Sequence, residues 1–159
     1  MRIIIGVSDM KLSSSASDTL VTHALGSCVG VTIYDPVATV GGMLHYMLPQ
    51  SSIDEKKAQS NPYMFADVGI PRFFREAYKR GAKKENMRVV IAGGAQVFSR
   101  NDFFAIGKRN VVMARKMFWK NNVLIAAEHV GSNIARTLYL DMSNGSTWIT
   151  SNGERIDLR

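Results

Sequence analysis

The stretch CVGVTIYDPVATVGGMLHYML, residues 28–48, decides how this chain folds. Two apolar runs rich in β-branched residues flank a short segment that contains a proline. Proline suits the second position of a tight turn, because its ring already fixes φ at the value that the turn needs. We therefore predict a β-hairpin in which residues 28–35 and 40–48 are the strands and residues 35–39 form the turn.

Strand-like segments recur on both sides of this hairpin. In the tail, the first of two Asn-Gly pairs predicts a type I′ hairpin between residues 134–142 and 146–151. The polar segment 49–62 is bounded by prolines, and we expect it to be a surface loop. Further strands are expected at residues 2–6, 18–22, 87–95 and 123–130.

Two segments have the apolar spacing of helices. The first covers residues 67–82, with Asp67 as its N-cap and Gly81 as its stop. The second begins at Asn110, a favourable cap, and ends at the asparagine pair 121–122. Together with the strands, these helices predict an α+β fold, an α/β sandwich of mixed β-sheets flanked by helices. We expect one domain over residues 1–159.

Composition narrows the class of protein. The chain has one cysteine, which cannot form an internal disulfide, and its start reads as a strand rather than a signal peptide. We therefore expect a cytoplasmic protein in a reducing compartment. No apolar run approaches the length of a membrane-spanning helix, so we expect no membrane insertion.

Positive charge is concentrated in the middle of the chain. Residues 72–120 hold 13 Lys and Arg against three acids, whereas the rest of the chain is net negative. This basic window is either the solvated faces of two helices or a surface for a partner with acidic groups. The chain shows no aromatic-interleaved RNA motif and no helix-turn-helix, so we expect no nucleic-acid partner.

Cys28 is either a nucleophile or a small apolar residue of the core. Gly26 lacks a side chain, which could allow another backbone to approach closely at this point. Ser27 and Cys28 lie where a loop enters a strand, and backbone N–H groups there are not all used by a sheet. Free N–H groups of this kind can bind an oxyanion. We therefore predict that Gly26 and Ser27 form the substrate-binding backbone beside Cys28.

A thiol nucleophile needs a base, and the hairpin selects among three histidines. With a two-residue turn at Pro36 and Val37, Cys28 would lie directly opposite His45, close enough for a thiolate–imidazolium pair. A loop longer by two residues would leave His45 diagonal to Cys28 on the same face, and a slip by one residue would separate them. Without the thiol, His45 would be interpreted as a core histidine.

The other histidines are weaker candidates for the base. His23 is expected in an exposed loop, and no thiol is predicted near His129. The scattered histidines and the lone cysteine lack metal-ligand spacing, so we expect neither a metal nor a cofactor. Thr22 could return to the pair and orient His45 through its hydroxyl or carbonyl, although a threonine at this place is more typical of an ordinary β-branched strand residue.

The segment 21–49, VTHALGSCVGVTIYDPVATVGGMLHYMLP, resembles the signature of the CheD family, the chemoreceptor glutamine deamidases of bacterial chemotaxis. The resemblance continues through YMFADVGIPRFFREAYKRGA at 63–82, IAGGAQVF at 91–98, IGKRN at 106–110 and AEHVGSNIAR at 127–136. It covers nearly the whole chain. A Gly-Ser-Cys followed by a histidine seventeen residues later is its most specific feature.

This resemblance implies a cysteine-hydrolase triad of Cys28 as nucleophile, His45 as general base and acid, and Thr22 as third member. It implies a fold similar to the catalytic domain of deamidating bacterial toxins. Family members convert glutamine side chains of chemoreceptor cytoplasmic helices to glutamate, and some also hydrolyse receptor methyl esters. Many bind the phosphatase CheC, which can compete with the receptors.

Two points are left open by the resemblance. At residues 129–132 the family commonly has Asp and a Gly-Gly pair, whereas this chain has His-Val-Gly-Ser. That difference bears on substrate or partner preference rather than on the type of reaction. The alternative function is a non-catalytic chemotaxis adaptor that binds receptors or CheC.

Overall fold

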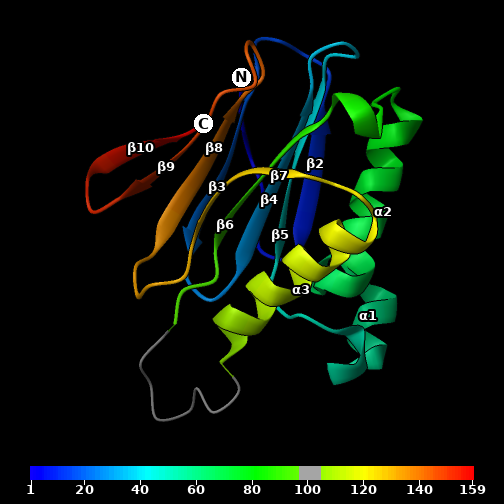
Figure 1. Ribbon diagram of the computed structural model, residues 1–159, viewed down its shortest axis with the longest axis vertical. Coiled ribbons are helices and arrows are strands. Elements are labelled where there is room, and N and C mark those ends of the chain that lie inside the picture. Colours follow the sequence, from blue (N-terminus) through cyan, green and yellow to red (C-terminus); the bar gives the residue numbers. More distant parts are fainter. Residues whose placement is uncertain (97–104) are drawn as a thin grey trace.

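The structure is a computed structural model that describes residues 1–96 and 105–159. Two five-stranded sheets and a layer of helices stack in three layers (Figure 1). The outer sheet has the strand order β1-β3-β8-β9-β10, and the central sheet has the order β2-β5-β4-β6-β7. Both sheets are mixed, because β1 pairs with β3 and β6 pairs with β7 in parallel while the other neighbours are antiparallel. The predicted α+β class is confirmed.

The elements have the following bounds. The strands of the outer sheet are β1 Arg2–Ile4, β3 Thr19–Leu25, β8 Arg136–Asp141, β9 Thr147–Ser151 and β10 Glu154–Leu158. Those of the central sheet are β2 Asp9–Ser13, β4 Val29–Asp35, β5 Val40–Tyr46, β6 Arg88–Gly93 and β7 Ile125–Val130. The α-helices are α1 Glu55–Ser60, α2 Ala66–Lys79 and α3 Ile106–Lys120, and the 3₁₀ turns are Ser51–Ile53, Pro62–Met64 and Lys84–Asn86.

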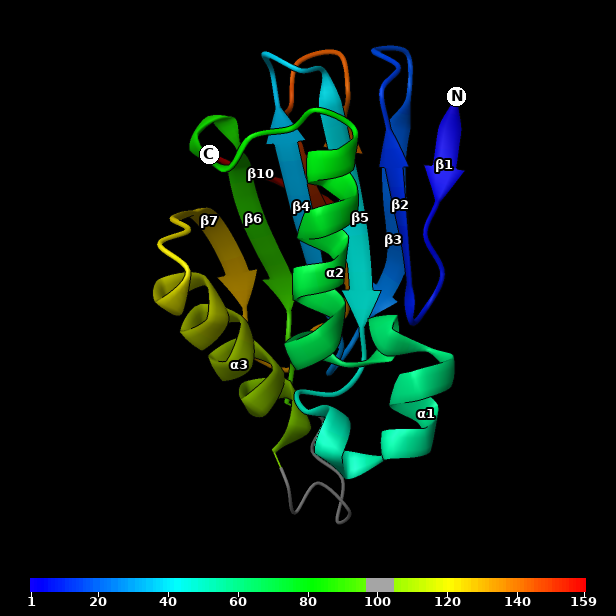
Figure 2. The same cartoon turned by 90° about the vertical axis from the view of Figure 1, so that its right-hand side faces the viewer.

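Two apolar layers hold the three structural layers together. Helices α2 and α3 lie on one face of the central sheet (Figure 2), where side chains such as Val31, Leu44 and Phe73 are buried. On its other face the central sheet packs against the outer sheet through residues such as Met43 and Leu138. Strands β4 and β5 contribute to both layers, because successive side chains of a strand point to opposite faces. No helix in the described parts of the chain is long and apolar enough to cross a membrane.

Several element boundaries differ from the sequence prediction. Segment 49–62, expected to be a surface loop, contains the 3₁₀ turn Ser51–Ile53 and α1, and a second 3₁₀ turn begins at its last residue. Helix α2 begins after Phe65, so Asp67 lies in its first turn and accepts hydrogen bonds from Ser51. Gly81 does end this helix, with a φ of +101°. Strand β2 was not expected from its sequence, because this edge strand is largely half-exposed and has no apolar run.

The tight turn forms at the second Asn-Gly pair instead of the first. Hairpin β8–β9 forms as predicted, but the first Asn-Gly pair lies in a loop longer than two residues, because Leu140 and Thr147 are the last residues of this hairpin that pair. The two-residue turn with positive φ at both positions is instead Asn152-Gly153, between β9 and β10. Helix α3 begins four residues before Asn110, which is therefore buried inside the helix and is not its cap.

Candidate active site

The β4–β5 hairpin sets the relative position of Cys28 and His45. Asp35 pairs with Val40, so four residues form the loop, and the register found is the alternative with a loop longer by two residues. The carboxylate of Asp35 explains the longer loop, because it accepts hydrogen bonds from the backbone N–H groups of Val37 and Ala38. In this register Gly30 lies opposite His45, and Cys28 directly precedes β4.

Cys28 and His45 nevertheless lie on the same face. The loop has two residues more than a two-residue turn, so the side chains of Cys28 and His45 still point to the same face of the sheet. His45 is a diagonal neighbour of Cys28 instead of its direct partner. Cys28 packs against the apolar layer between the two sheets. His45 is 1% exposed and faces Thr22 of the outer sheet. The candidate site is therefore at one end of the inter-sheet layer, near the start of α3 (Figure 1).

The hydroxyl of Thr22 fixes the tautomer of His45. Thr22 Oγ1 donates to the carbonyl of Ile5 at 2.8 Å and lies 2.7 Å from His45 Nδ1. A hydroxyl has one hydrogen to donate, so here it accepts from Nδ1–H. The lone pair of the imidazole is consequently on Nε2. That atom is buried and has no hydrogen-bond partner, Cys28 Sγ included, within the described chain.

A β-bulge aims Thr22 at the histidine. The pairing of β3 with β8 shifts between Thr22 and Leu25, and Ala24 has a φ of +57°. Bulges re-aim side chains and are frequent beside active sites. His23 lies within the bulge, on β3 instead of in a loop, and is exposed as predicted.

Burial keeps both reacting groups neutral in the resting protein. It lowers the pKa of His45 to about 4. Burial also raises the pKa of Cys28 above its usual value, although the residue's own backbone N–H opposes this shift. The resting pair is therefore a thiol and a neutral imidazole. The thiolate–imidazolium pair considered from sequence is not the resting state.

In the loop before β4, the N–H groups of Ser27 and Cys28 donate to no other residue in the described parts of the chain. The close backbone approach expected at Gly26 is not found, since a Cβ there would meet nothing within 4 Å. The close approach occurs at Gly93, where a Cβ would lie 2.3 Å from the carbonyl oxygen of Cys28.

Sequence reasoning missed three residues of the site. Gly30 lies opposite His45, and a Cβ there would lie 2.8 Å from Leu138, so a larger residue would push the sheets apart beside the imidazole. Gly93 falls within the strand expected over residues 87–95. Asn110 was interpreted as a helix cap, although it falls on the apolar stripe of α3 with Gly107 and Ala114. A polar residue on such a stripe, or a glycine inside a strand, was the available signal.

His129 is committed to another contact. Its Nδ1 accepts from Arg136 Nε at 2.8 Å, and Arg136 also donates to the carbonyl of Gly131 at 2.7 Å. Burial lowers the pKa of His129, and the cation of Arg136 lowers it further. Residues 129–132, where the chain departs from the family pattern, are thus held by a buried arginine, and Gln96 N–H donates to the carbonyl of Ser132.

The described part of the basic window lies mainly on the helix layer. Its exposed cations include Arg72, Arg75 and Lys79 of α2 and Lys108 and Lys116 of α3. Two cations of the window have acidic partners, as Lys79 pairs with Glu76 and Arg115 with Glu128. Arg100 and Asp102 of this window, and the end of the segment 91–98, lie outside the described residues.

Comparison with known proteins adds to this geometry. A family model described as CheD chemotactic sensory transduction matches residues 47–151. A protein of Syntrophus aciditrophicus named "Probable chemoreceptor glutamine deamidase CheD 1" is 52% identical over 151 residues, which cover 95% of this chain and 94% of that protein. A "Probable chemoreceptor glutamine deamidase CheD" of Solibacter usitatus is 45% identical over 157 residues, covering 99% and 93%. The solved structure of Neisseria meningitidis protein NMB0706 matches 82% of this chain and 63% of its own with a TM-score of 0.45 and 8% identity.

Proposed function

This chain belongs to the CheD family, and from that premise we propose that it is a chemoreceptor glutamine deamidase with Cys28 as nucleophile and His45 as base. The whole of residues 1–159 serves as one catalytic domain. The observation that supports this function best is the state of His45. Its Nδ1 hydrogen is held by Thr22, and its Nε2 lone pair is buried, without a partner among the described residues, on the face that Cys28 shares.

The first half of the reaction consumes the carboxamide. As Cys28 Sγ attacks the Cδ of the substrate glutamine, the thiol proton moves to His45 Nε2. The carbonyl oxygen becomes an oxyanion, which the free N–H groups of Ser27 and Cys28 can bind. When the tetrahedral intermediate collapses, His45 gives its proton to the leaving nitrogen. Ammonia departs and a thioester joins Cys28 to the substrate.

The second half regenerates the thiol. A water molecule gives a proton to His45 Nε2 while its oxygen attacks the thioester carbon. The same backbone donors bind the second oxyanion. The carbon–sulfur bond then breaks, the imidazolium returns its proton to Cys28 Sγ, and a glutamate side chain is released. Thr22 stays hydrogen-bonded to Nδ1 throughout, so the ring keeps its orientation.

The receptor is the partner that this chemistry requires. A chemoreceptor cytoplasmic helix carries many acidic residues, and the exposed cations of α2 and α3 would complement them. We place this reaction in the cytoplasm, where the receptor helices and a reduced thiol are found. We further propose that CheC is a second partner that competes with the receptor.

The function is tested with Cys28→Ala and a purified receptor cytoplasmic fragment. Mass spectrometry of the fragment after incubation reports each glutamine that becomes glutamate. We expect wild-type protein to convert specific glutamines and the variant to convert none. Because the chain has one cysteine, wild-type protein blocked with a thiol alkylator is the matched control and should behave like the variant.

Two outcomes would contradict the proposal. If Cys28→Ala still deamidates the fragment, Cys28 is not the nucleophile. If the variant loses deamidation but supports full chemotactic signalling in cells, the adaptor role is the principal one.

A further inference from the structure

Asn110 lies at the point where the hairpin ends meet helix α3. The residue is fully buried, and its backbone carbonyl accepts a hydrogen bond from the hydroxyl of Tyr46 at 2.6 Å. The position of its backbone, from which the side chain extends, is therefore fixed. Because burying an amide without hydrogen bonds is costly, the contacts of this side chain indicate why the residue is polar.

One carboxamide ties the two strands of the site together. Asn110 Nδ2 donates to the carbonyl of Ser27 at 2.9 Å and to the carbonyl of Met47 at 2.8 Å. Ser27 directly precedes Cys28, and Met47 follows His45 by two residues. Extension of the β4–β5 register places Cys28 opposite Met47. The amide thus bridges the strand that carries the thiol and the strand that carries the imidazole.

The bond to Ser27 also sets the direction of a free donor. The carbonyl of Ser27 and the N–H of Cys28 belong to one peptide unit, which is planar and trans, so the two groups point in opposite directions. Anchoring the carbonyl on Asn110 therefore turns the Cys28 N–H away from α3. That N–H donates to no other residue in the described parts of the chain.

The peptide units on either side are anchored in the same way. Ala95 N–H donates to the carbonyl of Gly26 at 2.9 Å, and Gly94 N–H donates to the carbonyl of Cys28 at 2.8 Å. Three successive carbonyls are thus held by backbone or side-chain donors. Only the middle one, at Ser27, depends on a side chain.

We propose that Asn110 is a positioning residue of the deamidase, which orients the Ser27–Cys28 peptide unit as an oxyanion donor. This inference rests on the proposed function. Asn110 acts through the backbone and does not need to touch the substrate. Its effect should therefore be specific to steps in which an oxyanion forms.

The test replaces the donor while keeping the shape, with Asn110→Asp, and removes the side chain with Asn110→Ala. We expect kcat for deamidation of a receptor fragment to fall about 100- to 1,000-fold in both variants, with KM changed by less than about threefold. Alkylation of Cys28 at alkaline pH forms no oxyanion. We therefore expect its rate to stay within about threefold of wild type.

Asn121→Ala is the matched control. This residue also donates its amide to a carbonyl, that of Met117, but it does so at the exposed far end of α3. We expect its kcat to equal that of wild type. An unchanged kcat in both Asn110 variants would overturn the inference. So would an equal loss of deamidation and alkylation, because the thiol itself would then have moved.

A wild-type measurement keeps the proposal testable if both Asn110 variants unfold. An aldehyde analogue of the glutamine side chain should add to Cys28 and form an oxyanion-like adduct. We expect the adduct to slow hydrogen exchange of the Cys28 amide, measured by NMR, and unchanged exchange would overturn the inference. Wild-type protein that forms no glutamate in any receptor fragment would instead count against the proposed function.

Discussion

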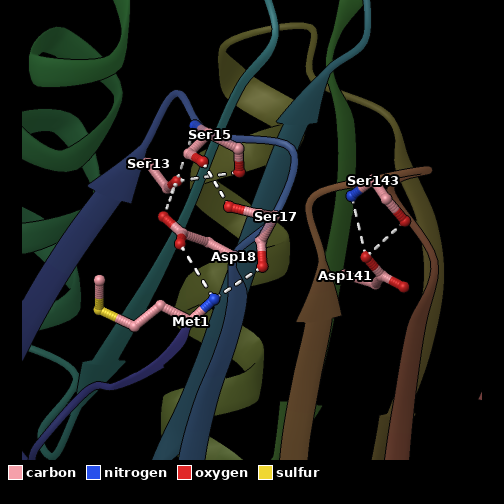
Figure 3. A network of polar contacts seen from close by, with 7 residues as sticks. All are labelled: Met1, Ser13, Ser15, Ser17, Asp18, Asp141 and Ser143. Carbon is pink, nitrogen blue, oxygen red and sulfur yellow. Dashed lines mark hydrogen bonds and ion pairs between the residues drawn. The ribbon is translucent and has the colours of Figure 1, made fainter.

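The two ends of the sandwich differ in whether their buried polar groups have hydrogen-bond partners. At the end remote from Cys28, the carboxylate of Asp18 accepts from Ser13 Oγ at 2.7 Å and lies 3.6 Å from the terminal ammonium of Met1 (Figure 3). Ser13 Oγ in turn accepts from the N–H of Ser15. Every member of this network has a partner, so it stabilises the β2–β3 connection.

At the end that carries Cys28, some buried polar atoms have no hydrogen-bond partner in the described chain. Within the described chain three buried side-chain atoms lack partners, and two of them, His45 Nε2 and Asn110 Oδ1, are at this end. The third, Thr32 Oγ1, lies midway along β4. An unpaired buried polar group costs roughly 1–3 kcal/mol. Its presence beside a free thiol indicates a site arranged for a substrate rather than for stability.

The largest expected effect comes from removing the unpaired base. His45→Gln should lower kcat for deamidation about 100- to 10,000-fold, because it removes the imidazole that takes the thiol proton. At neutral pH the free energy of unfolding should fall by roughly 1 kcal/mol, since Nδ1–H donates to Thr22 whereas Nε2 has no partner in the described chain. His23→Ala removes an exposed histidine of β3 and is the control for kinetics. A His45→Gln variant with wild-type kcat would contradict the assignment.

Acidic pH should lower the free energy of unfolding, because His45 is buried in its neutral form. The unfolded imidazole takes up a proton below its ordinary pKa of 6.5, whereas the folded one resists until pH about 4. Unfolding is therefore favoured increasingly as the pH falls from 6.5 to 4, by about 3 kcal/mol in total. Denaturant titrations across this range should show that loss in wild-type protein and a smaller one in His45→Gln. Parallel curves for the two proteins would rule out this source of acid sensitivity.

Thr22 links a buried group that has partners to one that lacks them. Its hydroxyl donates to the carbonyl of Ile5 and accepts from His45 Nδ1–H, whereas His45 Nε2 has no partner in the described chain. Thr22→Val keeps the shape but leaves Nδ1–H without its acceptor, so both tautomers become available. We expect kcat to fall roughly 10- to 100-fold, as is typical when the group that orients a functional histidine is lost. Thr22→Ser retains the hydroxyl and should restore most of the activity. If valine and serine have equal kcat values, the hydroxyl does not orient the ring.

The even number of residues in the β4–β5 loop explains how much of this site could be predicted from the sequence. Cys28 and His45 lie on the same face for any even loop length, so a loop of four residues in place of two did not separate them. The bulge that aims Thr22 depends on the pairing of β3 with β8, which lies far along the chain. The bridge made by Asn110 joins α3 to two strands, and local sequence carries no record of such contacts. The carboxylate of Asp35 set a loop length that turn propensity alone did not reveal.

The smallest expected effect on catalysis comes from the satisfied end. Asp18→Ala removes the acceptor of Ser13 Oγ and the partner of the Met1 ammonium, so the free energy of unfolding should fall by about 2 kcal/mol. Because Asp18 directly precedes β3 at the end of the sandwich remote from Cys28, kcat should stay within about twofold of wild type. Ser13→Ala removes the other half of the 2.7 Å hydrogen bond and should not add its full cost in the double variant. Denaturant unfolding of the four proteins measures this coupling. If the costs add in full, the two residues act independently, and the Asp18 network does not stabilise this end as one unit.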